Sequence, residues 1–352
     1  MTTSPAPAPY HSRCQYLPLR FYRSRDLSVF QWAEEQFELE ISTGLAGDSE
    51  FHRRSAATVE LMDQLPLQAK DLFRGLIDRL RLQPADDFEV DELGVWHPGE
   101  MRINCDPARV AELQGWPSDG AQVRQLLQTT LIHECGHALL EDPRGGVSLR
   151  SFMHLLVVSG WLPNPLHDPV PFQQPVGEPA QLTEHLLQRL REVDSRWDPD
   201  QTVRAPGQPP PVRLDSDLMG DGRTWQPGGE RPAPTLGLRS PRQLGKELLT
   251  QRTRGTLDAE LRSVGLSAEQ VWRVASRYRP VTSCAEDLIS EAPAEIFRQL
   301  HRGPVPWRAA QTALREGERL LIQPWRDAEL VRGRSEPAPR PNLKRHLVPG
   351  RA

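Results

Sequence analysis

Two histidines and a glutamate lie close together in the sequence, at a spacing that suits metal chemistry. The segment 126–140 reads LLQTTLIHECGHALL and contains His133, Glu134 and His137. On a helix, residues four apart lie one turn above each other, so the two imidazoles face the same way and can close on one zinc ion. We therefore predict that His133 and His137 are zinc ligands.

Glu134 is the predicted general base. Zinc lowers the pKa of its bound water towards about 7, and a neighbouring carboxylate can accept the proton as that water attacks a carbonyl. Gly136 is expected to leave room beside the metal. The opposite face of the helix is apolar and would anchor it in the core. This face consists of Val123, Leu127, Leu131, Cys135 and Leu139.

Two histidines make only part of a zinc site, so a third protein ligand must come from elsewhere in the chain. A third histidine in the arrangement His-x-x-Gly-x-x-His is excluded, because Leu140 and Pro143 occupy the Gly and His positions. The acidic candidates all lie in the segment 282–297, and they are Glu286, Glu291 and Glu295.

Glu291 is the favoured third ligand, with Glu286 and Glu295 as the alternatives. Pro293 is best tolerated in the first turn of a helix, which predicts a helix that begins near Ser290 with Glu291 at its start. Because Glu291 and Glu295 are four apart, they would share a helix face. One carboxylate could bind the metal while the other orients a ligand histidine. A solvated acidic helix start, stabilised by the helix dipole, is the competing interpretation.

With these residues, the sequence resembles the gluzincin metallopeptidases grouped around the anthrax-lethal-factor-like peptidases. Those enzymes pair a His-Glu-x-x-His helix with a later segment of the type Ser-Tyr-(six residues)-Glu-x-x-Ala-Glu-x-Phe. Here Ser283-Cys284, followed by Glu291-Ala-Pro-Ala-Glu295-Ile-Phe297, falls on that pattern without a gap. The resemblance covers the predicted hairpin, the motif helix and the Glu291 helix.

The resemblance implies a zincin-like fold and a set of roles for the site residues. It also implies that the strand around 101–104 lies beside the cleft and aligns the substrate backbone. The implied zinc ligands are His133, His137 and Glu291, the base is Glu134, and Glu295 supports a ligand histidine from outside the coordination sphere.

One position departs from the family pattern. The family's tyrosine, which helps to stabilise the oxyanion, is Cys284 here, and a thiol is a poor donor by comparison. Tyr278 is close in sequence and could substitute, but a packing role is the favoured interpretation for it.

The elements that must position these residues are predicted from the spacing of the apolar residues. Helices are expected over about 26–40 and 55–82. Two strands within 88–104 flank His97-Pro-Gly99, which predicts a hairpin. The next helix, about 121–141, contains the His-Glu-x-x-His motif. We expect an α+β fold, rich in helices, with a small antiparallel β-sheet packed on the motif helix.

The chain is expected to divide into parts of different character. The segment 163–240 is rich in proline, and only 181–197 within it has a helical pattern. A loop of this length is improbable inside a compact core. Helices are expected to resume at about 241–253, 257–264, 267–279, 290–302 and 305–322. The expected parts are a disordered N-terminal tip (1–20), a zincin core with the hairpin and motif helix (21–162), a Pro-rich insertion or linker (163–240), a helical part that completes the metal site (241–330) and a loose tail (331–352).

Composition excludes some classes of function. The 43 Lys and Arg residues against 47 Asp and Glu residues give a formal charge of -4, so charge provides no argument for nucleic acid or an anionic membrane. The four cysteines form no Cys-x-x-Cys pair, which argues against a disulfide framework and a thiolate zinc knuckle. The first residues show no secretory signal and the most apolar window, 152–162, is too short to span a membrane. We expect a cytoplasmic protein.

The expected function is that of a zinc-dependent metallopeptidase acting on a peptide or protein substrate. The alternative from another class is a non-enzymatic interaction protein in which zinc is structural or lost and the Pro-rich insertion docks a protein partner. Cys284, at the position of the family tyrosine, is the best support for this alternative. A third possibility is a regulatory peptidase that cuts one specific partner, such as a repressor.

Overall fold

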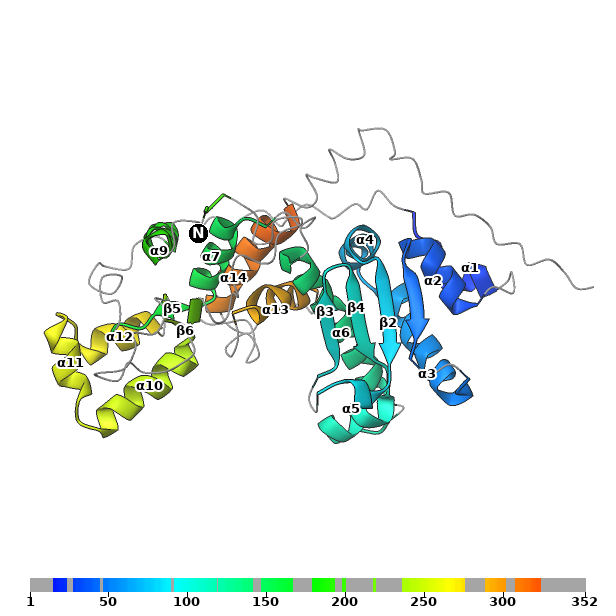
Figure 1. Cartoon of the computed structure of the whole chain (residues 1–352), viewed down its shortest axis with the longest axis horizontal. Helices are drawn as coiled ribbons and strands as arrows, with labels where there is room; N and C mark the ends of the chain where they lie inside the picture. Colours follow the sequence, from blue (N-terminus) through cyan, green and yellow to red (C-terminus); the bar gives the residue numbers. More distant parts are fainter. Residues whose placement is uncertain are drawn as a thin grey trace, which may run out of the picture.

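The structure is a computed structural model of the whole chain (Figure 1). It describes residues 15–23, 28–44, 47–89, 92–118, 120–141, 147–166, 179–193, 198–200, 218–219, 236–275, 289–301 and 308–323. One part of the molecule contains a β-sheet and the helices behind it, and the other part is mostly helical (Figure 1). The two parts meet where α6 (Ala121–Glu141) packs against α13 (Glu291–Leu300).

The main sheet is mixed, which corrects the prediction of an antiparallel sheet. The order of its strands is β1-β2-β4-β3, and β1 pairs with β2, and β2 with β4, in parallel. Only β3 and β4 are antiparallel, and they form the predicted hairpin around His97-Pro-Gly99. The strands are β1 (Glu40–Thr43), β2 (Arg79–Gln83), β3 (Gly94–His97) and β4 (Glu100–Asn104).

Strands β1 and β2 lie at the ends of segments whose apolar spacing predicts helices. The parallel pairing of these two short strands was therefore not expected. Helix α2 ends at Phe37, and β1 follows directly. The long helix predicted over 55–82 is broken, because Pro66 opens a new helix and the chain turns into β2 after Leu76. The helices in this region are α1 (Leu19–Arg23), α2 (Val29–Phe37), α3 (Ser49–Glu60), the 3₁₀ turn η1 (Leu61–Gln64) and α4 (Leu67–Leu76). Helices α3 and α4 form the crossover that parallel pairing of β1 and β2 requires.

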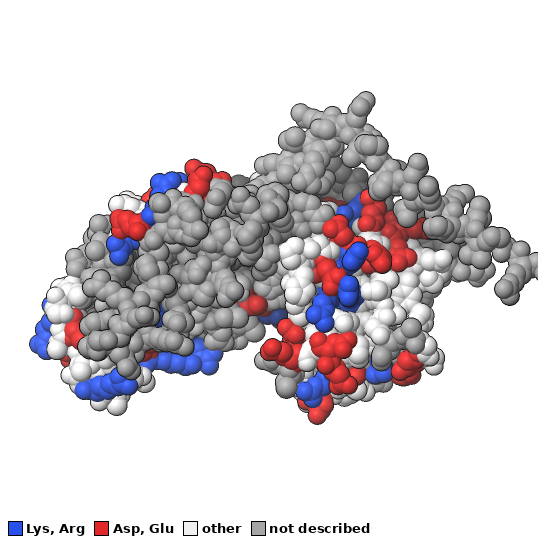
Figure 2. Space-filling model, viewed as in Figure 1, with Lys and Arg blue, Asp and Glu red and all other residues white. Residues whose placement is uncertain are grey.

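The two faces of the sheet differ in polarity, as alternation along each strand requires. Helix α6 lies behind the sheet and buries its predicted apolar face, including Leu131 and Cys135, which are both fully buried. The buried residues of the inner sheet face are Leu80, Leu82, Trp96, Met101 and Ile103. The outer face is polar and open, with arginines beside acidic residues (Figure 2), as in the ion pair of Arg81 with Glu100 at 2.9 Å.

In the helical part, α13 packs against α7 (Leu149–Val158), α14 (Arg308–Gly317) and η5 (Glu318–Ile322). Helix α7, which the apolar spacing did not predict, is almost completely buried and packs against α9 (Pro179–Val193), α13 and α14. Helix α5, after β4, was also not predicted. In the sheet part, the other short elements are η2 (Ala85–Asp87) and α5 (Pro107–Gln114).

The two ends of the Pro-rich segment 163–240 lie next to each other. Strand β5 (Leu162–Pro163) pairs antiparallel with β6 (Leu238–Arg239), and three helices follow β6. These are α10 (Pro241–Thr253), α11 (Leu257–Ser263) and α12 (Ala268–Ala275). Much of 163–240 lies outside the described residues, so its role as an insertion stays a prediction. In the described part of the chain, no helix is both long and apolar enough to cross a membrane.

Candidate metal centre

Helix α6 places His133, Glu134 and His137 at the boundary between the two parts of the molecule. It spans Ala121–Glu141, the bounds that the apolar spacing predicts. Glu134 is only 3% exposed and His137 only 8% exposed, so both side chains lie in a largely dehydrated environment. Cys135, inside the motif, points into the core and is fully buried, in agreement with a packing role.

Helix α13 begins at Glu291, as the position of Pro293 predicts. Ser290 is the N-cap residue, and Pro293 lies in the first turn, where its missing N–H leaves no hydrogen bond unmade. Burial holds this helix in place, because six consecutive residues are buried. They are Ala292, Pro293, Ala294, Glu295, Ile296 and Phe297.

The fold brings Glu291 to both motif histidines, although it lies far from them in the sequence. The Nε2 atom of His133 is 3.1 Å from Oε2 of Glu291, and the Nε2 atom of His137 is 3.4 Å from Oε1 of the same carboxylate. The two Nε2 atoms are 3.1 Å apart. One ligand atom of each residue, His133, His137 and Glu291, lies within 4.8 Å of the other two. The group could therefore hold a metal ion.

The donor set fits zinc. Two imidazole nitrogens and one carboxylate oxygen are a set that zinc binds in catalytic sites, where a fourth position stays open. In a tetrahedral site with metal–ligand bonds of about 2.0–2.1 Å, ligand atoms are about 3.3–3.4 Å apart. The two Nε2 atoms are 3.1 Å apart, and Nε2 of His133 is 3.1 Å from Oε2 of Glu291, which is close to that value, while Nε2 of His137 lies 3.4 Å from the other carboxylate oxygen, Oε1.

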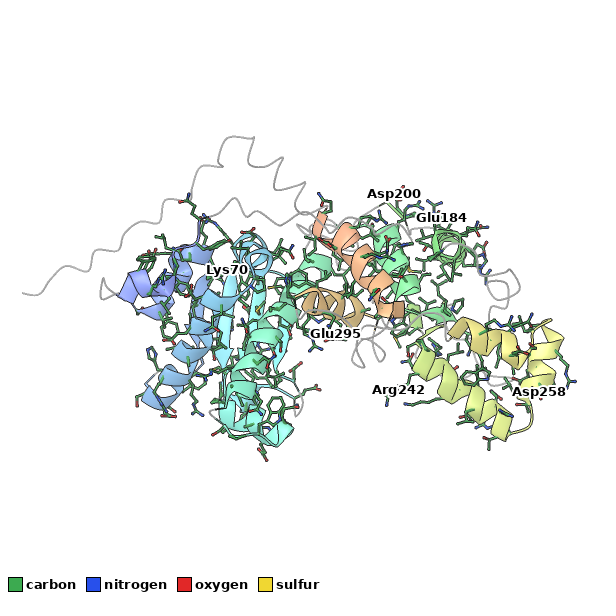
Figure 3. The ribbon with its side chains drawn as sticks, turned by 180° about the vertical axis from the view of Figure 1, so that it is seen from behind. Lys70, Glu184, Asp200, Arg242, Asp258 and Glu295 are labelled. Atoms are coloured by element: carbon green, nitrogen blue, oxygen red, sulfur yellow. The ribbon has the colours of Figure 1, made fainter. Side chains whose placement is uncertain are left out.

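Glu295 lies on the other side of the His133 ring. Its Oε1 is 3.0 Å from Nδ1 of His133, whereas Glu291 faces Nε2 of the same ring. The Glu295 side chain is 1% exposed, and its Oε2 accepts a hydrogen bond of 2.5 Å from Nη2 of Arg298. Figure 3 shows Glu295 on α13, beside α6. At this distance the carboxylate is placed to orient the His133 ring from the side away from Glu291.

The ionisation of the site follows from the short distances between the histidine rings and the glutamate carboxylates. Burial by itself lowers the pKa of His133, but the adjacent Glu291 and Glu295 carboxylates outweigh it and raise the pKa to about 10. Burial likewise opposes the charged form of His137, yet Glu291 raises its pKa. For Glu291, burial favours the neutral acid, but His133 and His137 hold its pKa well below the usual range. Without metal, a charged His133 is therefore paired with Glu291 and Glu295.

A cleft of about 510 Å³ opens beside this group. It has the size of pockets that hold small ligands. Its wall includes His133, Glu134, His137 and Glu291 together with Gly94, Val95 and Trp96 of β3. The Glu134 carboxylate faces β3 closely, because a Cβ placed on Gly94 would lie 2.6 Å from its Oε1.

The strand beside the cleft is β3, which corrects the expectation that the strand around 101–104 has this place. Strand β4 lies one position further into the sheet, between β2 and β3. The Leu93 carbonyl accepts a hydrogen bond from the Asn104 N–H at 3.0 Å, so Leu93 faces β4. By alternation, the backbone groups of Gly94 and Trp96 point to the opposite edge of β3, which pairs with no other strand in the described part of the chain.

Gly136 also has a different role from the expected one. A Cβ on Gly136 would overlap Cα of Ala294 and would lie 3.1 Å from the Ala294 carbonyl oxygen. The space beside Gly136 is therefore filled by the backbone of α13, and it is not open room beside the metal.

Sequence reasoning missed two further residues of the site, Gly94 and Arg298. A glycine inside a predicted strand is a signal of close approach, which in hindsight indicates Gly94. Arg298 follows Glu295 by three residues on a helix, a spacing that favours an ion pair. Glu286, Cys284 and Tyr278 lie outside the described residues, so their predicted roles are not addressed by the structure.

Comparison of the chain with models of known protein families, with curated proteins and with solved structures finds no match. The site is thus defined by its own geometry: a largely buried group of two histidines and one glutamate, able to hold a metal ion and placed in a cleft.

Proposed function

We propose that this protein is a zinc-dependent metallopeptidase that hydrolyses peptide bonds in the cleft between α6, α13 and β3. The observation that supports this most is the position of Glu291 at both Nε2 atoms of the motif histidines, 3.1 and 3.4 Å away. In this proposal His133, His137 and Glu291 hold the metal. A bound zinc ion would supply Lewis acidity, which acidifies water and polarises a carbonyl.

Glu134 is the proposed general base. Its carboxylate lines the same cleft as the metal group and is buried, which favours proton transfer at a defined position. In hydrolysis it would accept a proton from the attacking water and then deliver that proton to the leaving amine. Such a group contributes about 10²- to 10⁴-fold to the rate.

The outer edge of β3, which no other described strand pairs with, is the reason to propose a peptide as the substrate. An extended peptide can add to an exposed strand edge through backbone hydrogen bonds, which requires no particular side chain. The Gly94 and Trp96 backbone groups point to that edge, and both residues line the cleft. A peptide held there would pass directly in front of Glu134.

The test measures zinc content and hydrolysis in the same preparations. We expect one zinc ion per chain and cleavage of a proteome-derived peptide mixture, detected as new termini by mass spectrometry. Glu134→Gln should keep the zinc and lose cleavage, while Glu269→Gln, which removes a carboxylate from an exposed ion pair on α12, should keep both. Stoichiometric zinc without any cleavage by the unmodified protein would contradict a peptidase and favour the non-enzymatic alternative.

A further inference from the structure

Arg298 forms an ion pair that differs from the other pairs of the same spacing in its burial. The side chains of Arg298 and Glu295 are 17% and 1% exposed, whereas those of Arg53 and Glu50 are 76% and 57% exposed. Exposed pairs of this kind contribute little to stability. A largely shielded arginine paired with a buried carboxylate is costly to desolvate, which is consistent with a requirement for specific geometry.

Glu295 divides its two oxygens between Arg298 and His133. Nη2 of Arg298 donates to Oε2 at 2.5 Å, and Oε1 is 3.0 Å from Nδ1 of His133. Because both oxygens are engaged, the plane of the carboxylate is fixed from two sides. The imidazole ring that it contacts has its other nitrogen, Nε2, close to Glu291 and His137.

We propose that Arg298 is a positioning residue of the metal centre, which acts through Glu295 to set the orientation of the His133 ring. The inference rests on one part of the proposed function, namely that His133 binds a metal. Arg298 lines the cleft but is not required to touch the substrate or the metal. Its guanidinium is well suited to this role, because its planar set of donors fixes a carboxylate more rigidly than an ammonium group does.

The experiment measures zinc affinity, by competition with a chromophoric chelator, and the visible spectrum of the cobalt-substituted protein. Arg298→Met should weaken zinc binding about 10- to 100-fold, the usual effect of removing an outer-sphere partner, and should change the cobalt spectrum. Arg298→Lys should recover part of the affinity. Arg53→Met, on an exposed pair, is the control and should leave both readouts unchanged.

A double-mutant cycle separates this role from simple packing. In a Glu295→Ala background, Arg298→Met should cause no further loss of zinc affinity, because its path to His133 is already removed. Additive losses, or wild-type affinity and cobalt spectra in both Arg298 variants, would overturn the inference. Zinc affinity and the cobalt spectrum can both be measured without turnover. The role of Arg298 can therefore be confirmed even if the protein cleaves no peptide, and it can be contradicted even if the protein is a peptidase.

Discussion

Gly136 on α6 and Ala294 on α13 touch backbone to backbone, and this contact brings the two halves of the metal site together. A Cβ at position 136 would overlap Cα of Ala294. Gly136 lies between the histidine pair on its helix, and Ala294 lies between Glu291 and Glu295 on the other. The close approach of these two helices therefore sets the distance from the carboxylates to His133.

Gly136→Ala should destabilise the protein and damage metal binding together. The new methyl group would meet backbone atoms of Ala294, including the carbonyl oxygen at 3.1 Å, and backbone cannot rotate away. Overpacking of this kind costs about 1–3 kcal/mol, and moving α13 would also withdraw Glu291 from the histidines. Chemical denaturation and zinc titration measure the two effects.

Gly245→Ala is the matched control for that substitution, because it also adds a methyl group inside a helix. Its nearest new contact is the Trp272 ring at 3.6 Å, which is an ordinary distance. We expect an unchanged zinc affinity and a stability equal to or greater than that of the parent by about 0.4–1 kcal/mol. Equal behaviour of the two variants would contradict the role of the Gly136–Ala294 contact.

Gly94→Ala should slow hydrolysis while leaving the metal bound. A Cβ there would lie 2.6 Å from Oε1 of Glu134 and 2.8 Å from Cγ2 of Thr130, so the carboxylate must move. Misplacement of a catalytic group by about 1 Å can cost about 10²-fold in rate. The measurement is kcat with zinc content determined in parallel. Loss of zinc, or a rate like that of Gly245→Ala, would argue against this explanation.

Zinc binding should release protons, and its affinity should rise with pH. Without metal, ion pairs raise the pKa of His133 from the ordinary 6.5 to about 10, but a metal ligand must be a neutral imidazole. Protons therefore compete with zinc at all pH values below about 10. Calorimetry at pH 8 in buffers of different ionisation enthalpy counts the released protons, and zero release would contradict a raised pKa of His133.

The same pKa shift predicts how the stability of the metal-free protein depends on pH. Because the folded-state pKa of His133 lies above its unfolded value, the ion pairs stabilise the fold fully below about pH 6.5, and this contribution is lost as the pH rises through about 10. Denaturation of the metal-free protein between pH 6 and 10 measures it. Glu291→Gln removes one partner of His133, so the pH dependence should be weaker in that variant.

Replacement of Glu291 should affect metal binding far more than replacement of Glu286. Glu291→Ala removes a proposed ligand, so zinc affinity should fall by more than the roughly 10- to 100-fold caused by the loss of an outer-sphere partner. Glu286→Ala should leave the affinity unchanged. A larger loss in Glu286→Ala would identify that residue as the third ligand.

The elements that hold the site residues were predictable because their signals are local. The buried positions of α6 recur every four residues, and both of its predicted ends were correct. Pro293 restricted the start of α13 to within one residue of Glu291. In both helices, the residue types themselves define the face or the end of the helix.

The arrangement of the sheet was less predictable because parallel pairing connects distant segments. Strand β2 has the alternation of a half-buried strand, with Leu80 and Leu82 fully buried between exposed arginines. That signal was visible, but it is five residues long and directly follows a strongly amphipathic helix. Because the helical spacing of apolar residues in α4 continues into β2, the strand was predicted as part of the helix.

The relationship between helices was the least predictable feature. Gly136 was expected to make room for a metal, yet it makes room for Ala294, which is more than a hundred residues away. Which face a glycine opens depends on the partner helix, and the local sequence does not contain that information. Arg298 acquires its significance only once Glu295 is known to contact His133.

Anomalous diffraction at the zinc absorption edge, from crystals grown with zinc, tests the central claim most directly. The claim predicts one anomalous peak per chain at about 2.0–2.2 Å from Nε2 of His133, Nε2 of His137 and a carboxylate oxygen of Glu291. A peak that is bound by the histidines but lies out of reach of Glu291, or a strongest peak elsewhere on the chain, would contradict it.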